Sequence, residues 1–483
     1  MPIVLLSTFM SASGGRVALL VAALGVVAAV AAIAAGKLGM FSAAPPPRPL
    51  AIVASCDTAG WIMPCGCSAH QSGGLARRGA YVKRCRETAD VLVVDVGGAP
   101  GGSSAYDRMK FAAILRGEAE MDAAAHNLGG AELALGPAEL QSLAREPGVR
   151  FVSANVRDAQ DKPLFPPLRV VSAGSRRVVI VGVVSPKFAT PACRVSDPRA
   201  SIVAALATVA EKPGAVVVLA YLPAEELLAL ARELPEVDVL IGGPTRQSIA
   251  PQSIGPTLVA AVTNKGKFLA HFRAPAGDAG RWSGTVVEMD DQIPDDRDQS
   301  QNLAQFHRAL VDRDFTAQET AFAPVLQNDL PAGYQVAGVK ACRSCHPDDC
   351  RGWDETAHAQ AWQTLVERGV QGDSYCQQCH TTAFGLPGGF VSARRSPERT
   401  NVGCESCHGP SQEHVEQPRA KTYFAAHDQC LRCHDRENNP GFVYTAAWEK
   451  IEHGVAAQNP ATRNPQAQDT QRRPSGPEKE DLR

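Results

Sequence analysis

Short apolar runs alternate with amphipathic stretches along the middle of the chain, from residue 50 to residue 290. Six of the runs are rich in valine, isoleucine and leucine: LAIVAS, VLVVDVG, VRFVSANV, RRVVIVGVV, AVVVLAY and VDVLIGG. Continuous apolar runs of this length are typical of strands buried on both faces. Helical patterns such as ASIVAALATVAEK and PAEELLALARELP lie between several of them. The alternation predicts an α/β domain built from layers of sheet and helix.

A longer apolar run occupies residues 17–36 and contains no charged side chain. A bilayer is spanned by about 20 apolar residues, whereas the core of a signal peptide has only about 7 to 15. The run therefore predicts an uncleaved transmembrane anchor, with residues 1–16 in the cytoplasm. A cleaved signal peptide is the alternative. Residues 41–49 are rich in proline and predict a semi-rigid linker.

The pattern changes again after the α/β domain. Residues 291–334 begin with an acidic, polar stretch and are interpreted as a linker. Residues 335–455 carry eight cysteines in four similar motifs. Residues 456–483 lack a hydrophobic pattern and are expected to be disordered. A length of 483 residues fits two or three domains, and a formal net charge of −2 gives no reason to expect a nucleic-acid partner.

Four pentapeptides share the pattern C-x-x-C-H: CRSCH, CQQCH, CESCH and CLRCH. This pattern is the attachment signal for c-type haem, because two thiols three residues apart reach both vinyl groups of one porphyrin and the histidine ligates its iron. Zinc ribbons and disulfides do not require a histidine after every pair. Four haems are therefore expected. Their attachment residues are Cys342, Cys345, Cys376, Cys379, Cys404, Cys407, Cys430 and Cys433, with proximal His346, His380, His408 and His434.

Further histidines in this region are candidates for the distal axial positions: His358, His414, His427 and His453. Ligation by two histidines leaves no open position on the iron and suits electron transfer. His427 is the weakest candidate because it lies close to the next motif. The sequence does not assign distal histidines to haems, because a ligand can come from a different motif. About 120 residues are too few to build a large core, so the porphyrins would have to form it and lie close together.

The stretches CRSCHPDDCRGWDETAHAQAW, CQQCHTTAFGLPGGF, NVGCESCHGPSQEHV and CLRCHDRENNPGFVYTAAWEKIEHG resemble the tetrahaem cytochrome c-554 family. The resemblance implies a mostly helical and irregular multihaem domain, with axial roles for His358, His414 and His453. In that family one haem can lack a distal ligand, so the role of His427 decides whether one iron is open. Cys350 departs from the family pattern.

Haem attachment by this motif takes place outside the bacterial cytoplasm. We therefore expect a protein anchored in the inner membrane with its bulk in the periplasm. Secretion to the periplasm after signal cleavage is the alternative.

Residues 50–275 resemble the 5′-nucleotidase branch of the metallophosphoesterases. The matching pieces follow the family's order: IVASCDTAG, SGGLARRGAYV, VLVVDVGGA, MDAAAHNLGGAELALG, FVSANV, VVIVGVVSP, AVVVLAY and VDVLIGGPTR. The resemblance implies two β-sheets packed as a sandwich and flanked by helices. Metal ligands would lie on loops at the strand ends, the general place for ligands in α/β sheets.

The ligand positions of that family are largely replaced. Asp57, Asp95 and Glu132 remain at their positions. The third motif has lost its histidine, although His126 lies nearby. The replacements are Ala59 for a histidine, Gly98 for the bridging aspartate, Gly130 and Ala131 for Asn-His, Tyr221 for a histidine, and Pro244 and Arg246 for the last pair. Two-metal hydrolysis needs carboxylates and imidazoles around both ions. We expect no divalent metal pair and no catalytic residue here.

Five cysteines remain in the α/β domain: Cys56, Cys65, Cys67, Cys85 and Cys193. With Cys350 they form an even set, which in an oxidising compartment is typical of disulfides. The alternative is a redox-active or metal-binding thiol site at Cys65-Gly66-Cys67, because a bridge across one residue would be strained. His70 is interpreted as a solvated loop histidine, and the weaker interpretation is that it tunes such a thiolate or completes a metal site. The neighbouring SGGLARR is interpreted as a turn into a helix over 75–87 with solvated charges, and a phosphate cradle is the weaker reading.

Three functions are compatible with these patterns. We expect a membrane-anchored tetrahaem cytochrome that transfers electrons and carries a non-catalytic nucleotidase-like domain. Its partners would be redox proteins, such as a quinone-linked dehydrogenase or other cytochromes. One alternative is a multihaem oxidoreductase acting on a small nitrogen or sulfur compound. The other, a 5′-nucleotidase with an accessory cytochrome, is disfavoured by the lost ligands.

Overall fold

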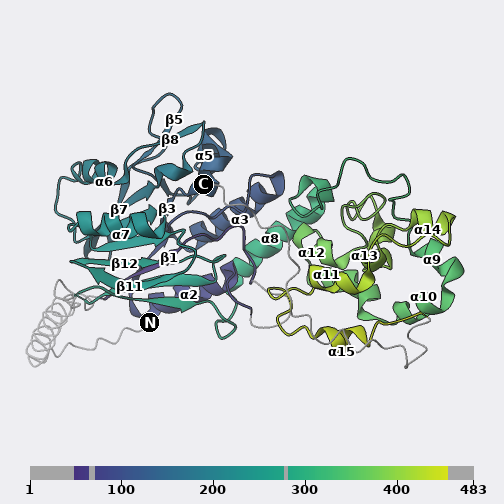
Figure 1. The fold of residues 1–483 in the computed structure, drawn as a ribbon. Coiled ribbons are helices and arrows are strands. Elements are labelled where there is room, and N and C mark those ends of the chain that lie inside the picture. Colours follow the sequence, from purple (N-terminus) through teal and green to yellow (C-terminus); the bar gives the residue numbers. More distant parts are fainter. Residues whose placement is uncertain (1–47, 65–70, 277–280, 455–483) are drawn as a thin grey trace, which may run out of the picture. The chain divides into compact units, whose positions relative to one another are not determined.

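The computed structural model describes residues 48–64, 71–276 and 281–454 (Figure 1). No helix within these ranges is long and apolar enough to cross a membrane. The anchor predicted for residues 17–36, most of the linker at 41–49 and the tail at 456–483 lie outside the described residues.

Two six-stranded sheets form the α/β domain. The first has the order β14 (Ser283–Glu288), β13 (Phe268–Ala274), β1 (Leu50–Ser55), β2 (Asp90–Asp95), β3 (Ala123–Asn127) and β4 (Phe151–Val152). The second has the order β11 (Ile249–Ile254), β12 (Thr257–Ala261), β10 (Val239–Gly243), β9 (Ala215–Tyr221), β7 (Arg176–Val184) and β6 (Leu168–Ala173). A short ladder joins β5 (Val156–Asp158) to β8 (Cys193–Val195).

The central strands of each sheet run parallel, from β1 to β4 in one and through β7, β9, β10 and β12 in the other. Their carboxyl ends therefore meet at one edge of each sheet, the place where α/β folds carry their sites. The inner faces bury apolar side chains such as Ile52, Val94, Ile180 and Leu219 against one another. Full burial of each such side chain contributes about 1.5–3 kcal/mol.

Helices cover the outer faces of this sandwich (Figure 1). On the second sheet, apolar residues of α6 (Pro198–Leu206) and α7 (Ala224–Glu233) join one cluster. On the first sheet, Tyr81, Val82 and Cys85 of α2 (Leu75–Thr88) join another. Three more helices are α3 (Ala105–Glu120), α4 (Gly130–Leu135) and α5 (Pro137–Leu143). The double-sheet sandwich flanked by helices is confirmed.

The prediction of a linker over residues 291–334 is wrong for its first half. Helix α8 (Arg297–Arg313) forms there, with Asp296 capping the backbone amides of Asp298 and Gln299. Leu303, Phe306 and Leu310 join the core of the sandwich. Their spacing of three and four residues is helical, but the polar residues that precede them hid the signal.

Residues 335–454 form short helices and irregular segments. The α-helices are α9 (Val339–Cys345), α10 (Pro347–Asp354), α11 (Ala361–Glu367), α12 (Ser374–His380), α13 (Glu405–His408), α14 (Gln412–Glu416) and α15 (Tyr444–Trp448). The apolar clusters of this region are small: one contains Phe384 and Phe390, and another contains Val336 and Leu386. The mostly helical and irregular character expected of a multihaem domain is present.

Candidate haem centres and the former metal edge

Three pairs of imidazole rings lie close together in the C-terminal region. The ring centroids are 6.3 Å apart for His346 and His414, 6.1 Å for His358 and His434, and 6.0 Å for His408 and His453. Two imidazoles on opposite sides of one metal, each bonded at about 2 Å, have ring centres roughly 6 Å apart. Each pair joins one proximal histidine of a C-x-x-C-H motif to one predicted distal histidine. The residues present therefore fit three bis-histidine irons.

Local backbone structure places the two thiols and the proximal imidazole of a motif on one side of the chain. The amide of His346 donates to the carbonyl of Cys342 at 2.9 Å, and the amide of His408 donates to that of Cys404 at 2.9 Å. Such bonds to the residue four positions earlier close a single helical turn. The short helices α9 and α13 of this region therefore serve to present haem attachment groups.

Hydrogen bonds orient several of these imidazoles. The Nδ1 atoms of His414 and His453 lie 2.7 Å from the carbonyl oxygens of Ala420 and Ile451. A ring that donates from Nδ1 to a carbonyl keeps Nε2 free of its proton and ready to ligate a metal. The chain thus holds both distal rings in the tautomer that binds iron.

The second motif differs from the other three. Among the described residues, no histidine ring pairs with His380, whose Nδ1 lies 2.7 Å from the carbonyl oxygen of Ala361. His427, the fourth distal candidate, lies with its Nε2 atom 3.2 Å from Asp428, and its side chain is 63% exposed. The structure therefore brings three of the four candidates to a proximal partner and leaves His427 at the surface.

Neighbouring motifs touch through their cysteines. The side chains of Cys342 and Cys404 lie close enough for each to shift the pKa of the other, and Cys379 likewise shifts the pKa of Cys433. Burial, followed by the nearby thiol of Cys430, raises the pKa of Cys407 to about 11. In space, the first motif therefore lies next to the third, the third next to the fourth, and the fourth next to the second. The order along the chain does not reveal this arrangement.

The carboxyl edge of the sandwich holds the residues that remain from the phosphoesterase pattern. Asp57 follows β1, and its Oδ2 atom accepts a hydrogen bond from Thr263 Oγ1 at 2.6 Å. The phenol of Tyr221, at the end of β9, lies near Asp57, and its pKa is raised, mainly by burial. A Cβ atom added to Gly98 would lie 2.8 Å from the Tyr221 ring. Tyr221 thus fills the space that a bridging aspartate would need.

Glu132 connects the loops that follow β2 and β3 through hydrogen bonds. Its carboxylate accepts backbone hydrogen bonds from Gly98 at 2.9 Å, Ala99 at 2.8 Å and Gly129 at 2.8 Å. Burial alone would raise the pKa of Glu132, but the bonds from His126 and these amides lower it. The loops that would carry metal ligands are therefore held by one buried carboxylate.

Asp95, Glu118 and His126 form the one group of three or more potential metal ligands that the described residues contain, with ligand atoms within 4.8 Å of one another. His126 Nδ1 lies 2.7 Å from Glu118, and Nε2 lies 3.3 Å from Glu132. Burial opposes its charge, yet these carboxylates raise the pKa of His126 well above its usual value. The imidazole of His126 lies between the two carboxylates, and each of its ring nitrogens is within 3.3 Å of one of them. The cluster is an internal ion network.

The thiols of Cys56, Cys85, Cys193 and Cys350 are buried and free, so the disulfide prediction is not supported for these four. Cys56 packs in the core between the sheets, whereas Cys85 packs under α2 on the other face of the first sheet. A disulfide needs Cα atoms within about 7 Å. Burial is also the main cause that raises the pKa of Cys56. The predicted site at Cys65, Cys67 and His70 lies outside the described residues.

The charges of SGGLARR are not solvated, and this prediction is wrong, although the helix that follows is confirmed. Arg77 is 7% exposed and Arg78 is 2% exposed. Arg78 donates to Ser55 Oγ at 3.1 Å and to Thr58 Oγ1 at 3.0 Å, and it lies 3.9 Å from Asp95. The guanidinium ties α2 to the ends of β1 and β2, so it is not available as a phosphate cradle.

Side chains near this edge contact the second and fourth haem motifs. The ring of Trp61, in the loop after β1, lies 5.1 Å from the ring of Tyr375, which directly precedes Cys376. Lys265 Nζ, after β12, lies 2.7 Å from a carboxylate oxygen of Glu437. These contacts put segments next to the second and fourth haem motifs beside the edge that holds Asp57 and Tyr221.

One buried group near the second motif was missed by sequence reasoning. His307 of α8 is 5% exposed, and its Nδ1 atom lies 4.0 Å from Asp373. Asp373 accepts hydrogen bonds from the phenol of Tyr106 and, at 3.0 Å, from the amide of Tyr375 at the start of α12. His307 lies outside the cysteine-rich region, in the segment interpreted as a linker, so no local pattern pointed to it.

The fold and the paired imidazoles together describe a c-type multihaem cytochrome region joined to an α/β sandwich. The family described as "Cytochrome c554 and c-prime" matches residues 341–409. A curated relative, cytochrome c-554 of Nitrosomonas europaea, is 35% identical in an alignment of 96 residues. The match covers 17% of this chain and 41% of the relative. The resemblance of the C-terminal region to the cytochrome c-554 family is therefore confirmed.

Solved structures similar to the chain include two phosphoesterases. A 5′-nucleotidase precursor from Thermus thermophilus is 25% identical, with a TM-score of 0.48, covering 55% of this chain and 59% of that one. The calcineurin-like phosphoesterase YfkN from Bacillus subtilis is 18% identical, with a TM-score of 0.48, covering 56% of this chain and 99% of that one. The chain thus spans under two thirds of the cytochrome relative and of the nucleotidase.

Proposed function

We propose that this protein is a tetrahaem electron carrier, held at the bacterial inner membrane by residues 17–36 with its bulk in the periplasm. The observation that carries the proposal is the set of three imidazole pairs, each 6.0–6.3 Å apart. Haem would bind covalently at the four C-x-x-C-H motifs and supply the reversible one-electron chemistry. The chain's own part is to hold the axial rings in a fixed tautomer and to keep neighbouring motifs in contact.

The order of the motifs gives the carrier two ends. The first motif lies beside the third, the third beside the fourth, and the fourth beside the second. Electrons would therefore enter near one of the end motifs and leave near the other. The partners would be redox proteins such as a quinone-linked dehydrogenase or another cytochrome.

The sandwich would have a structural role in this carrier and no hydrolytic one. Tyr221 occupies the space of a bridging aspartate, and Glu132 holds the loops that would carry the metals. The same edge contacts the second and fourth motifs through Trp61 and Lys265. The edge that carries Asp57 and Tyr221 would thus serve as the docking surface for the cytochrome domain.

A second candidate function is favoured by one observation, the absence of a histidine partner for His380 within the described residues. An iron with one axial ligand would be open at the second motif, as a multihaem oxidoreductase acting on a small nitrogen or sulfur compound requires. Carbon monoxide binding to the dithionite-reduced protein separates the two functions. A spectral change in one haem of four supports the oxidoreductase, and no change supports the pure carrier.

The haem assignment itself is tested by a pyridine haemochrome titration, with an expected result of four haems per chain. Fewer than four would contradict it. The non-catalytic role of the sandwich is tested by assaying hydrolysis of nucleoside monophosphates with Mn²⁺ added. Metal-stimulated turnover that is lost on changing Asp57 to Asn would contradict that role.

A further inference from the structure

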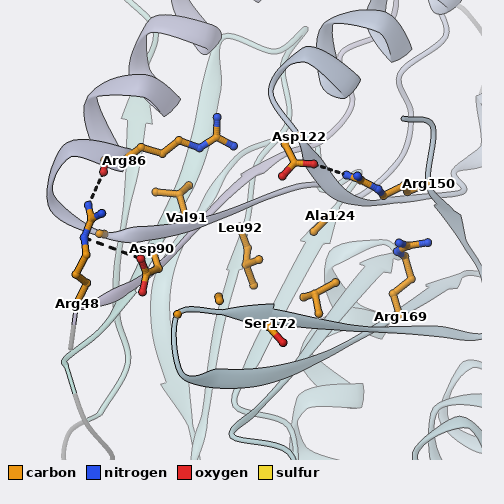
Figure 2. Close-up of a pocket in the computed structure, with 14 residues that line it drawn as sticks. Arg48, Arg86, Asp90, Val91, Leu92, Asp122, Ala124, Arg150, Arg169 and Ser172 are labelled. Atoms are coloured by element: carbon orange, nitrogen blue, oxygen red, sulfur yellow. Dashed lines mark hydrogen bonds and ion pairs between the residues drawn. The ribbon is translucent and has the colours of Figure 1, made fainter. Parts of the chain in front are cut away.

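A cavity of about 570 Å³ opens at the amino-terminal edge of the sandwich, opposite the edge that holds Asp57 and Glu132. Its walls are the beginnings of β2 and β3 and the hairpin between β6 and β7 (Figure 2). Cavities that bind small molecules generally measure about 300–1,000 Å³. The space is therefore large enough for an organic ligand.

Four arginines line this cavity: Arg48, Arg86, Arg150 and Arg169. Figure 2 shows Arg48 and Arg86 on one side and Arg150 and Arg169 on the other. Two aspartates offset part of the charge. Arg150 lies 2.7 Å from Asp122, and Arg48 lies 3.9 Å from Asp90. Four cations against two anions leave an excess of two positive charges in the cavity.

The two remaining guanidiniums have no carboxylate partner among the described residues. Arg86 donates to the backbone carbonyl of Met121 at 2.5 Å. The Nε atom of Arg169 is buried and has no hydrogen-bond partner in this part of the chain. Burial, followed by repulsion from Arg150, lowers the pKa of Arg169. A bound anion would offset the repulsion between Arg150 and Arg169.

The floor of the cavity is apolar and makes up a smaller part of the lining than the polar groups. It consists of side chains from β2, β3 and β6, namely Val91, Leu92, Ala124 and Val171. Guanidinium groups bind phosphate with two parallel hydrogen bonds, and an apolar floor favours a ligand that also has a hydrocarbon or planar part. A bare inorganic ion would use only part of this space.

We propose that this cavity binds an organic phosphate, with the phosphate on Arg169 and Arg150 and the apolar part on the floor. Two sources carry this chemistry: a soluble phosphate ester and a phospholipid headgroup. Arg48 directly follows the segment that leads to the predicted anchor at 17–36, so a headgroup source would place the cavity against the membrane. The proposal is independent of the electron-transfer function.

The test uses the full haem-loaded chain in detergent and phenyl phosphate as the soluble probe. Calorimetry should show binding that weakens at least tenfold in Arg169→Gln. Arg169→Lys should lose most of the affinity too, because an ammonium cannot form the two parallel bonds. Arg194→Gln, at an exposed arginine outside the cavity, is the matched control and should bind as the parent does. Thermal unfolding of each variant verifies that it folds.

A second arm compares vesicles of phosphatidylcholine with vesicles that also contain phosphatidylglycerol. An apolar anchor inserts into both, so the excess binding to the anionic vesicles isolates the headgroup. Loss of this excess in Arg169→Gln assigns a lipid source. Loss confined to phenyl phosphate assigns a soluble source. The proposal is overturned if phenyl phosphate does not bind the parent, or binds Arg169→Gln as well as the parent.

Discussion

The sandwich and the cytochrome region differ in what fills their interiors. Between the sheets, Ile52, Ile180 and Leu219 are fully buried against other side chains of the chain itself. Between residues 335 and 454, the apolar clusters are small, and the side chains that approach one another are imidazoles and thiols. The difference teaches that the first region can fold from its own hydrophobic surface, whereas the second depends on its cofactor.

The largest expected effect comes from withholding haem. A chain produced without the haem attachment machinery should keep a folded sandwich and lose the fold of residues 335–454, because so small an apolar core cannot offset the chain entropy. Limited proteolysis followed by mass spectrometry should show cleavage within 335–454 and protection of β1 to β14. The haem-loaded protein is the control. Equal protection of both regions would contradict the comparison.

A smaller change should affect one iron at a time. His414→Ala, His358→Ala and His453→Ala should each convert one low-spin haem to high spin, because each removes one ring of a pair 6.0–6.3 Å apart. Electron paramagnetic resonance of the oxidised protein measures this conversion. His427→Ala is the matched control and should leave the spectrum unchanged. A new high-spin signal in His427→Ala would show that His427 ligates the second iron.

Within the sandwich, the packing of Tyr221 against Gly98 can be tested with a matched pair. Gly98 has φ +78 and crowded surroundings, whereas Gly136 has φ +83 and open space around it. Both alanine variants carry the cost of a left-handed backbone, but only Gly98→Ala adds a clash. Urea unfolding should therefore show a loss in Gly98→Ala that exceeds that in Gly136→Ala by about 1–3 kcal/mol. Equal losses would mean that Tyr221 does not fill this space.

Taken per proton and per pH unit, the smallest expected effect is a dependence of sandwich stability on pH. Burial and the nearby Glu118 raise the pKa of Asp95 to about 7, and the pKa of His126 is also raised. The folded protein therefore holds these protons more tightly than the unfolded chain. The free energy of unfolding should decrease as pH rises from about 4 to beyond 7, by up to about 1.4 kcal/mol per pH unit for each proton released.

Urea unfolding at a series of pH values measures this decrease. Hydrogen exchange of the amides in β1 and β2, at the same pH values, checks it independently. Asp95→Asn should flatten the profile. Glu211→Gln, at an exposed carboxylate on the same domain, should leave it unchanged and is the control. A free energy that stays constant between pH 4 and 8 in the parent protein would contradict the shifted pKa values.

The sequence by itself determined the haem attachment motifs, because two cysteines and one histidine within five positions need only one helical turn. It also predicted the loss of most metal ligands, since alanine, glycine and proline offer no ligating side chain. The layered α/β architecture followed from its apolar runs. These features depend on local spacing or on residue type, and neither requires knowledge of the fold.

Only the tertiary structure decided which imidazoles meet. His358 pairs with His434, 76 positions later, and His414 pairs with His346, 68 positions earlier. The sequence also did not reveal three packing features: the burial of Arg78, the space filled by Tyr221 and the core role of Phe306. Each depends on segments that are far apart in the chain. Local patterns indicate the chemistry that a side chain offers. Packing between distant segments selects the residue that the side chain contacts.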